Sequence, residues 1–207
     1  MLLGRSTEEI IALLIALIPA FTVHEFAHAW AANRLGDPTA KDLGRLTLNP
    51  LKHLDVMGTL MVLMVGIGWA KPVPVNPYNL KHGRRDMALV AVVGPLSNLI
   101  MAVLVAFLWG LTDFAGDQLV RMILITFVYL NIALLFFNLL PVAPLDGFKV
   151  ALGILPVSWA NALAKTAQIG PMVLFGLIIL GSFIPGVDLL GWIVWKPTEA
   201  LVSMLLS

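Results

Sequence analysis

Charged residues are scarce in this sequence, and cysteine is absent. Only 12% of the 207 residues are charged and 59% are hydrophobic, whereas about 25% of a typical soluble domain is charged. So few charges could not cover the surface with groups that face water, which excludes a disordered chain, a nucleic-acid binder and an ordinary cytosolic enzyme. Without cysteine there are no disulfides, thiol chemistry or thiolate metal sites, so a bound metal would need nitrogen or oxygen ligands.

Long apolar runs take the place of the missing charge. The length predicts one all-α, polytopic membrane domain over residues 1–207, with five to six transmembrane helices of about 20 residues each. No cleavable signal peptide is evident in the first run. We expect Gly94-Pro95 to interrupt one run, Pro185-Gly186 to kink or divide another, and the tail 197–207 to form a short interfacial helix. The apolar runs cover 8–35, 56–70, 87–109, 122–140 and 171–195.

The basic residues predict how the chain is oriented. Eight of the thirteen Lys and Arg residues lie between Arg34 and Arg85, so the positive-inside rule places 31–86 mainly in the cytoplasm and 111–121 on the other side. If the run 56–70 crossed fully, half of this charge would lie outside, and we therefore expect it to dip in and return. The prolines that follow favour an extended or hairpin segment, embedded in the membrane over residues 69–77, that lines a cavity.

Two histidines and a glutamate in the first run carry chemistry. His24 and His28 lie four residues apart, so on a helix both imidazoles project from one face and can hold one zinc ion. Glu25 lies about 100° away around the helix, where it could take a proton from a metal-bound water. The structural alternative is a pair of core histidines bonded to helix carbonyls. However, the composition predicts only about 0.0015 chance His-Glu-x-x-His matches per chain.

A third ligand is expected from elsewhere in the chain. Catalytic zinc usually has three protein ligands and one open position for water. Asp146 follows the run that ends near Leu140, on the side assigned to the cytoplasm, which the first run also reaches just after His28. An Asp before Gly is often a turn residue, but beside the histidine pair Asp146 is the favoured third donor.

These residues carry a family resemblance. The motifs around His24 and Asp146 resemble those of the site-2 protease family of intramembrane zinc metalloproteases, and the chain resembles a compact prokaryotic member without appended soluble domains. Val56 departs from the family pattern, in which proline often follows the aspartate. The matching segments are His24-Glu25-Phe26-Ala27-His28, Gly36-Asp37-Pro38-Thr39-Ala40, Gly44-Arg45, Asn49-Pro50, His53-Leu54-Asp55, Gly68-Trp69-Ala70-Lys71-Pro72-Val73-Pro74, Gly94-Pro95-Leu96-Ser97-Asn98 and Asn138 to Gly147.

The resemblance implies a zinc endopeptidase that hydrolyses peptide bonds in or beside the bilayer. It implies one Zn²⁺ per chain held by His24, His28 and Asp146, with Glu25 as the general base. Asn98 is a candidate donor to the oxyanion, although it could equally hold two helices together. Asn138 has the same ambiguity and could instead bond a ligand.

Two further segments are open to interpretation. An unwound substrate could pair with the edge of the segment that contains Lys71, Val73 and Val75, and this is our candidate substrate strand. His53 and Asp55 resemble a second metal pair, but a solvated or capping histidine in a charged loop is the favoured interpretation.

Two rival functions remain at the level of sequence. A polytopic metal-ion transporter would need donors that continue to the opposite face, yet no histidine follows His82. A non-catalytic membrane adaptor of the same fold would have little need for Glu25. We expect a multi-pass protein of the cell membrane whose active site lies nearer the cytoplasmic face. Its partners would be lipid, substrates with a transmembrane segment and a regulatory membrane protein, but no nucleic acid.

Overall fold

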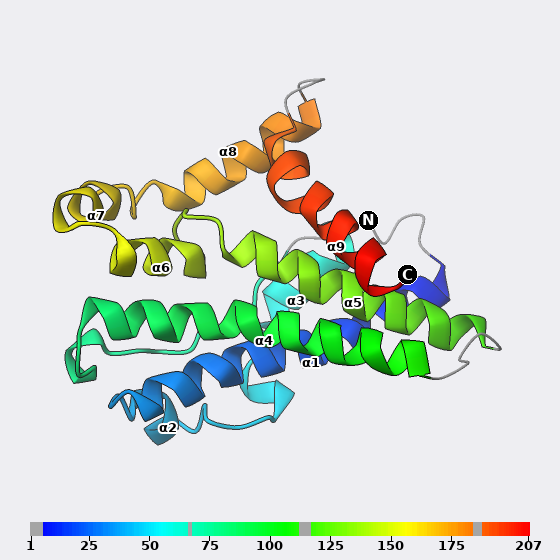
Figure 1. The fold of residues 1–207 in the computed structure, drawn as a ribbon, viewed down its shortest axis with the longest axis horizontal. Coiled ribbons are helices and arrows are strands. Elements are labelled where there is room, and N and C mark those ends of the chain that lie inside the picture. Colours follow the sequence, from blue (N-terminus) through cyan, green and yellow to red (C-terminus); the bar gives the residue numbers. More distant parts are fainter. Residues whose placement is uncertain (1–5, 66–67, 112–116, 184–187) are drawn as a thin grey trace.

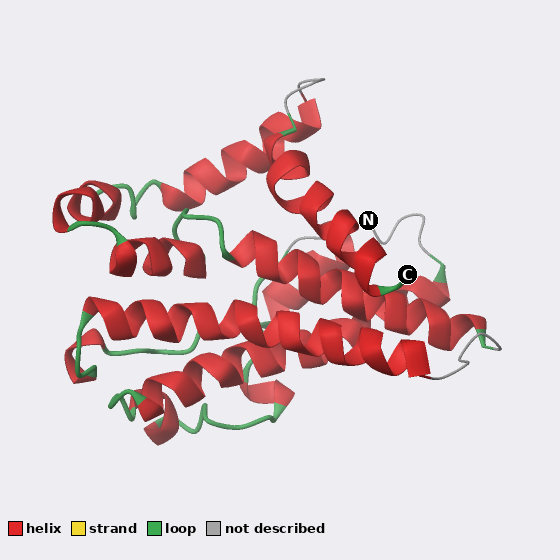
Figure 2. Ribbon diagram, in the orientation of Figure 1, coloured by secondary structure: helices red, strands yellow, loops and turns green. Residues whose placement is uncertain are grey.

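The computed structural model describes residues 6–65, 68–111, 117–183 and 188–207. Helices joined by loops make up this part of the chain (Figure 1). Within these ranges the structure contains no strand (Figure 2). Short helical turns cover Pro50–Lys52, Pro77–Asn79 and Gly191–Trp195. The α-helices are α1 (Thr7–Arg34), α2 (Thr39–Asp42), α3 (Val56–Val65), α4 (Arg84–Leu111), α5 (Gln118–Asn138), α6 (Asp146–Ile154), α7 (Val157–Ala164), α8 (Gly170–Phe183) and α9 (Lys196–Leu205).

Three long helices form the centre of the molecule. α1, α4 and α5 pack against one another (Figure 1), and each is long and apolar enough to cross a membrane. α1 begins at a capping box in which Ser6 and Glu9 satisfy each other's backbone N–H groups. The all-helical expectation is confirmed for the described residues, whereas the expected five to six spans are not confirmed.

The interruption expected at Gly94-Pro95 is wrong. α4 continues from Arg84 to Leu111 with Pro95 inside it, and both Gly94 and Pro95 are buried. Proline removes one backbone bond, but membrane helices tolerate it where neighbouring helices cover the backbone. Here α1 and α5 both pack on α4. The other break, expected at Pro185-Gly186, lies outside the described residues.

The run after Asp55 leaves the bundle and returns to its starting point. α3 is ten residues long, and beyond it Ala70 forms an antiparallel bridge with Leu54. The Lys71 N–H then donates to the carbonyl of His53 at 2.7 Å. This return agrees with the expectation that the run 56–70 comes back on itself, while its embedding in a membrane stays a prediction. Residues 71–76, which we call the proline segment, form neither helix nor strand, so the expected edge strand is not present as such.

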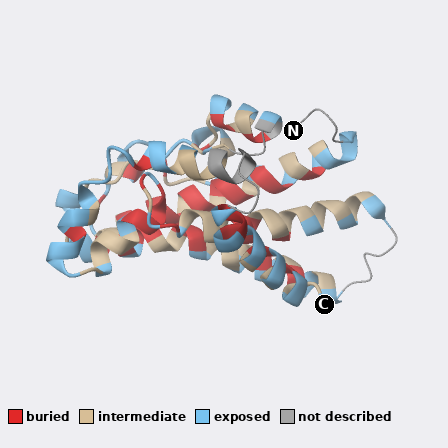
Figure 3. Cartoon of the chain, turned by 90° about the horizontal axis from the view of Figure 1, so that it is seen from above, coloured by how far each residue is buried: buried red, intermediate tan, exposed pale blue. Residues whose placement is uncertain are grey.

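Two of the remaining helices pack directly on this centre, whereas α7 and α8 extend away from it (Figure 1). α6 packs on α4, and α9 packs on α5. The tail expected at 197–207 is helical over Lys196–Leu205, but Val202 is buried against Val128 and Ile132 of α5. Buried residues accordingly gather along the middle of the bundle (Figure 3).

Candidate metal centre

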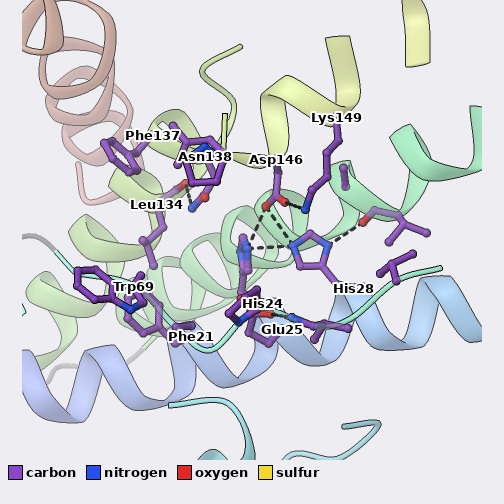
Figure 4. Close-up of a pocket in the computed structure, with 18 of the residues that line it drawn as sticks. Phe21, His24, Glu25, His28, Trp69, Leu134, Phe137, Asn138, Asp146 and Lys149 are labelled. Atoms are coloured by element: carbon purple, nitrogen blue, oxygen red, sulfur yellow. Dashed lines mark hydrogen bonds and ion pairs between the residues drawn. The ribbon is translucent and has the colours of Figure 1, made fainter. Parts of the chain in front are cut away.

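Three side chains from two distant helices converge inside the bundle. His24 and His28 lie one turn apart on α1, and Asp146 is the first residue of α6. The two histidine Nε2 atoms are 3.0 Å apart, and Asp146 Oδ2 lies 3.1 Å from that of His24 and 3.0 Å from that of His28 (Figure 4). All three residues are buried. Asp146 thus shares one site with two histidines that precede it by 122 and 118 residues.

Hydrogen bonds behind the two rings decide which nitrogen faces this site. His28 Nδ1 lies 2.8 Å from the carbonyl oxygen of Val90, which can only accept, so Nδ1 carries the proton. His24 Nδ1 lies 2.7 Å from Asn98 Oδ1. The Asn98 amide is oriented in turn, because its Nδ2 donates to the carbonyl of Ala20 at 3.3 Å and to Asn131 Oδ1 at 2.8 Å. In their neutral forms, both histidines therefore present an unprotonated Nε2.

Three acceptor atoms at this spacing fit a metal cation. Two lone pairs and a carboxylate oxygen face one another with no proton between them, and a single added proton would serve only one of the three contacts. A tetrahedral zinc site with bonds of about 2.0–2.2 Å separates its ligand atoms by about 3.3 Å, close to the observed edges. Among the described residues, His24, His28 and Asp146 form the one group of three or more metal-binding side chains. The donor set, nitrogen and carboxylate oxygen, suits zinc.

Glu25 lies beside this group, but its carboxylate faces the proline segment. Its Oε2 accepts the N–H of Val73 at 3.0 Å, and the side chain is buried. A cavity of about 290 Å³ opens here (Figure 4). It is lined by the three candidate ligands and Glu25, and by Phe21, Trp69, Val73, Val75, Leu134, Phe137, Asn138 and Lys149 among others. An apolar cavity with a few convergent polar groups is the usual form of a binding site.

The structure places the other predicted residues as follows. Asn98 is fully buried behind His24, while Asn138 lies on the cavity wall and donates to the carbonyl of Leu134 at 3.0 Å. Val73 and Val75 line the cavity, and Lys71 is exposed. For His53, which was expected to be solvated or capping, the solvated alternative is wrong. Its side chain is fully buried and its Nε2 lies 2.7 Å from the carbonyl of Thr47, because the loop folds over it.

Sequence reasoning missed three groups around the site. Lys149 Nζ lies 3.5 Å from Asp146 Oδ1, on the oxygen that faces away from the histidines. Its spacing of three residues from Asp146 on a helix could have indicated this pair. Asn131 orients Asn98, and its signal in the sequence is that of a polar residue within the apolar run 122–140. The carbonyl of Val90 left no signal in the sequence, because every residue has one.

Curated proteins similar to this chain carry zinc metalloprotease names. "Putative zinc metalloprotease YwhC" of Bacillus subtilis is 40% identical over 181 residues, which cover 83% of this chain and 83% of that protein. "Putative zinc metalloprotease Rip2" of Mycolicibacterium smegmatis is 35% identical over 76% of this chain, and its namesake in Mycobacterium tuberculosis is 31% identical over 82%. The matches span slightly less than two thirds of the Rip2 proteins, 62% and 65%. No protein-family model and no solved structure matches the chain.

Proposed function

We propose that the chain is an intramembrane zinc endopeptidase of the site-2 protease type. The premise is that it belongs to the family of zinc metalloproteases that includes YwhC and Rip2. The observation that carries this proposal is the convergence of His24, His28 and Asp146 next to Glu25. The three helices that are long and apolar enough to span a membrane, α1, α4 and α5, all contribute residues to the cavity beside that group. Residues 1–207 form one membrane-embedded protease domain in this proposal.

The chain's own residues would divide the work of hydrolysis. A zinc ion held by His24, His28 and Asp146 supplies Lewis acidity and lowers the pKa of bound water. Glu25 takes the proton of the water whose oxygen attacks the scissile carbonyl carbon. It then returns this proton to the amine nitrogen when the carbon–nitrogen bond breaks.

The two asparagines take different roles in this proposal. Both amide hydrogens of Asn98 are already committed, to Ala20 and Asn131, while its oxygen orients His24. Asn98 therefore acts as a positioning residue rather than as an oxyanion donor. Asn138 lines the cavity and has one amide hydrogen in addition to that given to Leu134, so it is the better donor to the oxyanion.

The substrate would be a membrane protein whose transmembrane segment unwinds along the proline segment. The Val73 N–H is occupied by Glu25, but the N–H of Val75 has no partner among the described residues. In an extended segment, residues two apart direct their backbone groups to the same side. Added backbone pairing at Val75 would thus place the unwound peptide beside Glu25.

We further propose a multi-pass location in the cell membrane, with the site nearer the cytoplasmic face. The support is the basic belt from Arg34 to Arg85, to which α1 leads just after His28. Lipid is the surrounding solvent, a regulatory membrane protein would select substrates, and nucleic acid is no partner. A metal-ion transporter would need further donors toward the opposite face, and a binding adaptor would not need Glu25, so neither rival gains support.

Purified protein in detergent tests this function directly. We expect the wild type to cleave a model single-span substrate and to contain one zinc ion. Glu25→Gln is expected to keep its zinc and to lose about 10²- to 10⁴-fold in cleavage rate, the range for general acid–base groups. Asp146→Ala should lose zinc. Cleavage that survives Glu25→Gln would exclude Glu25 as the base, and full zinc occupancy in Asp146→Ala would remove Asp146 from the ligand set.

A further inference from the structure

Arg45 holds the beginning of the proline segment. Its guanidinium donates to the carbonyl of Lys71 at 2.7 Å and to that of Pro72 at 3.2 Å. Arg45 is buried, and no salt bridge from it to a carboxylate is found within the described residues. Burial lowers the pKa of Arg45, and the negative charge of Glu25 partly offsets this effect. A buried cation is costly unless its donors are used. Here the two Nη atoms bind two consecutive carbonyls, while the buried Nε has no partner among the described residues.

Asp37 holds the other end of the same segment. Its side chain is fully buried; Oδ2 accepts the N–H of Asn76 at 2.7 Å, and Oδ1 accepts the Asn79 side-chain amide at 2.9 Å. The backbone N–H and the hydroxyl of Thr39 also donate to Oδ1. A carboxylate with this many donors is strongly fixed. It therefore anchors the segment to the turn that follows α1.

Between the contacts made by Arg45 and Asp37, the backbone N–H of Val73 is a donor held in a rigid stretch of chain. Pro72 and Pro74 have no N–H and fix their own φ angles, and a residue before proline is restricted to extended conformations. The Val73 N–H is the one group between the two prolines that can donate, and it binds Glu25 Oε2. The orientation of the Glu25 carboxylate is thus tied to the position of the proline segment.

We propose that Arg45 and Asp37 are positioning residues of the proteolytic site, which clamp the proline segment at both ends so that the Val73 N–H orients the Glu25 carboxylate. The inference rests on the proposed function, since it assigns Glu25 the role of base. No hydrogen bond or ion pair joins either residue to the three candidate metal ligands, so the clamp acts on the base and not on metal binding. A purely structural role predicts something different, namely loss of the fold and of zinc together.

The test compares Arg45→Gln, Arg45→Lys and Asp37→Asn with the wild type. Lys52→Gln is the matched control, because Lys52 is an exposed cation in the same connection. Hydrogen exchange of residues 71–76 measures how firmly the proline segment is held, and it needs no substrate. We expect exchange to rise about 10-fold in the three variants, as for the loss of a hydrogen bond to a charged group. We expect kcat to fall about 10- to 100-fold, the range for residues that orient catalytic groups.

Zinc content and KM separate this clamp from a general structural role. Zinc should stay at one per chain, and KM should change less than kcat. Arg45→Lys keeps the charge but lacks the planar pair of donors, so it should behave as Arg45→Gln does. Wild-type kcat in variants with faster exchange would overturn the proposal, as would unchanged exchange. Joint loss of zinc and fold in both Arg45→Lys and Asp37→Asn would leave only a structural role. If the wild type does not cleave the substrate, the proposed function is wrong. Hydrogen exchange of residues 71–76 then tests the clamp by itself.

Discussion

At the scale of single residues, the hydrogen bonds behind the histidine rings matter as much as the ring atoms that face the site. Val90 and Asn98 each receive an Nδ1 proton and so leave both Nε2 atoms free. His24 and His28 were readily found from their spacing. Their orienting partners come from α4, and no sequence distance predicts which backbone carbonyl will lie behind a ring.

Gly94 allows α4 to approach these rings. A Cβ atom at this position would lie 2.3 Å from His28 Nε2 and 2.9 Å from His24 Cε1. We therefore expect Gly94→Ala to displace His28 and to reduce zinc content below half of the wild-type value. Gly110→Ala is the control in the same helix, because a Cβ there meets nothing within 4 Å. Metal analysis of the two purified variants checks this, and full zinc in Gly94→Ala would contradict it.

Asp37 predicts a pH dependence of stability. Burial opposes its charge, but hydrogen bonds from Thr39, Asn79 and Asn76 outweigh burial and hold the pKa of Asp37 below its ordinary value. Its contribution is therefore complete above the unfolded pKa of about 3.9 and is lost as the pH falls through the lower native pKa. Thermal unfolding from pH 7 to 3 should show wild type and Asp37→Asn converging at the acid end. A stability difference that stays constant with pH would contradict this.

At the scale of elements, the proline segment has two tasks that proline substitutions can separate. Val73→Pro removes the donor to Glu25, whereas Val75→Pro removes an N–H that has no partner among the described residues. We expect Val73→Pro to lower kcat and Val75→Pro mainly to raise KM, because the latter removes only the proposed pairing with substrate. Zinc content should be normal in both. Steady-state cleavage of a single-span substrate measures this, and an unchanged KM in Val75→Pro would exclude strand addition there.

The helices themselves were only partly predictable. The boundaries of α1 and the break before α6 follow from Ser6, Gly36 and Pro144, which are local signals. Pro95 carries the same kind of signal and yet lies within α4. Whether proline ends a helix depends on what covers the backbone around it, and that is a tertiary property.

At the scale of the whole molecule, a metal ion at this site would connect α1 to α6. Asp146 and the histidines contact each other across more than one hundred residues, so an ion bound there stabilises their association. A ligand at 100 times its Kd stabilises the native state by about 2.7 kcal/mol. A chelator should therefore lower the melting temperature of the wild type in detergent and leave that of Asp146→Ala unchanged. Equal shifts in both proteins would contradict a zinc link through Asp146.

The sequence by itself determined the class of the protein and the chemistry available to it. The low charge and the long apolar runs predict helices of membrane length. The absence of cysteine and the spacing of His24, Glu25 and His28 predict a zinc site with nitrogen and oxygen donors. Only the tertiary structure decided that Asp146 lies 3.0–3.1 Å from both rings, that Asn98 orients one of them, and that Val73 binds Glu25. These contacts join residues 48 to 122 positions apart. They exist because α1, α4 and α6 pack together and the proline segment packs against α1 and α4. Helical periodicity describes the face of one helix but not the neighbour it meets.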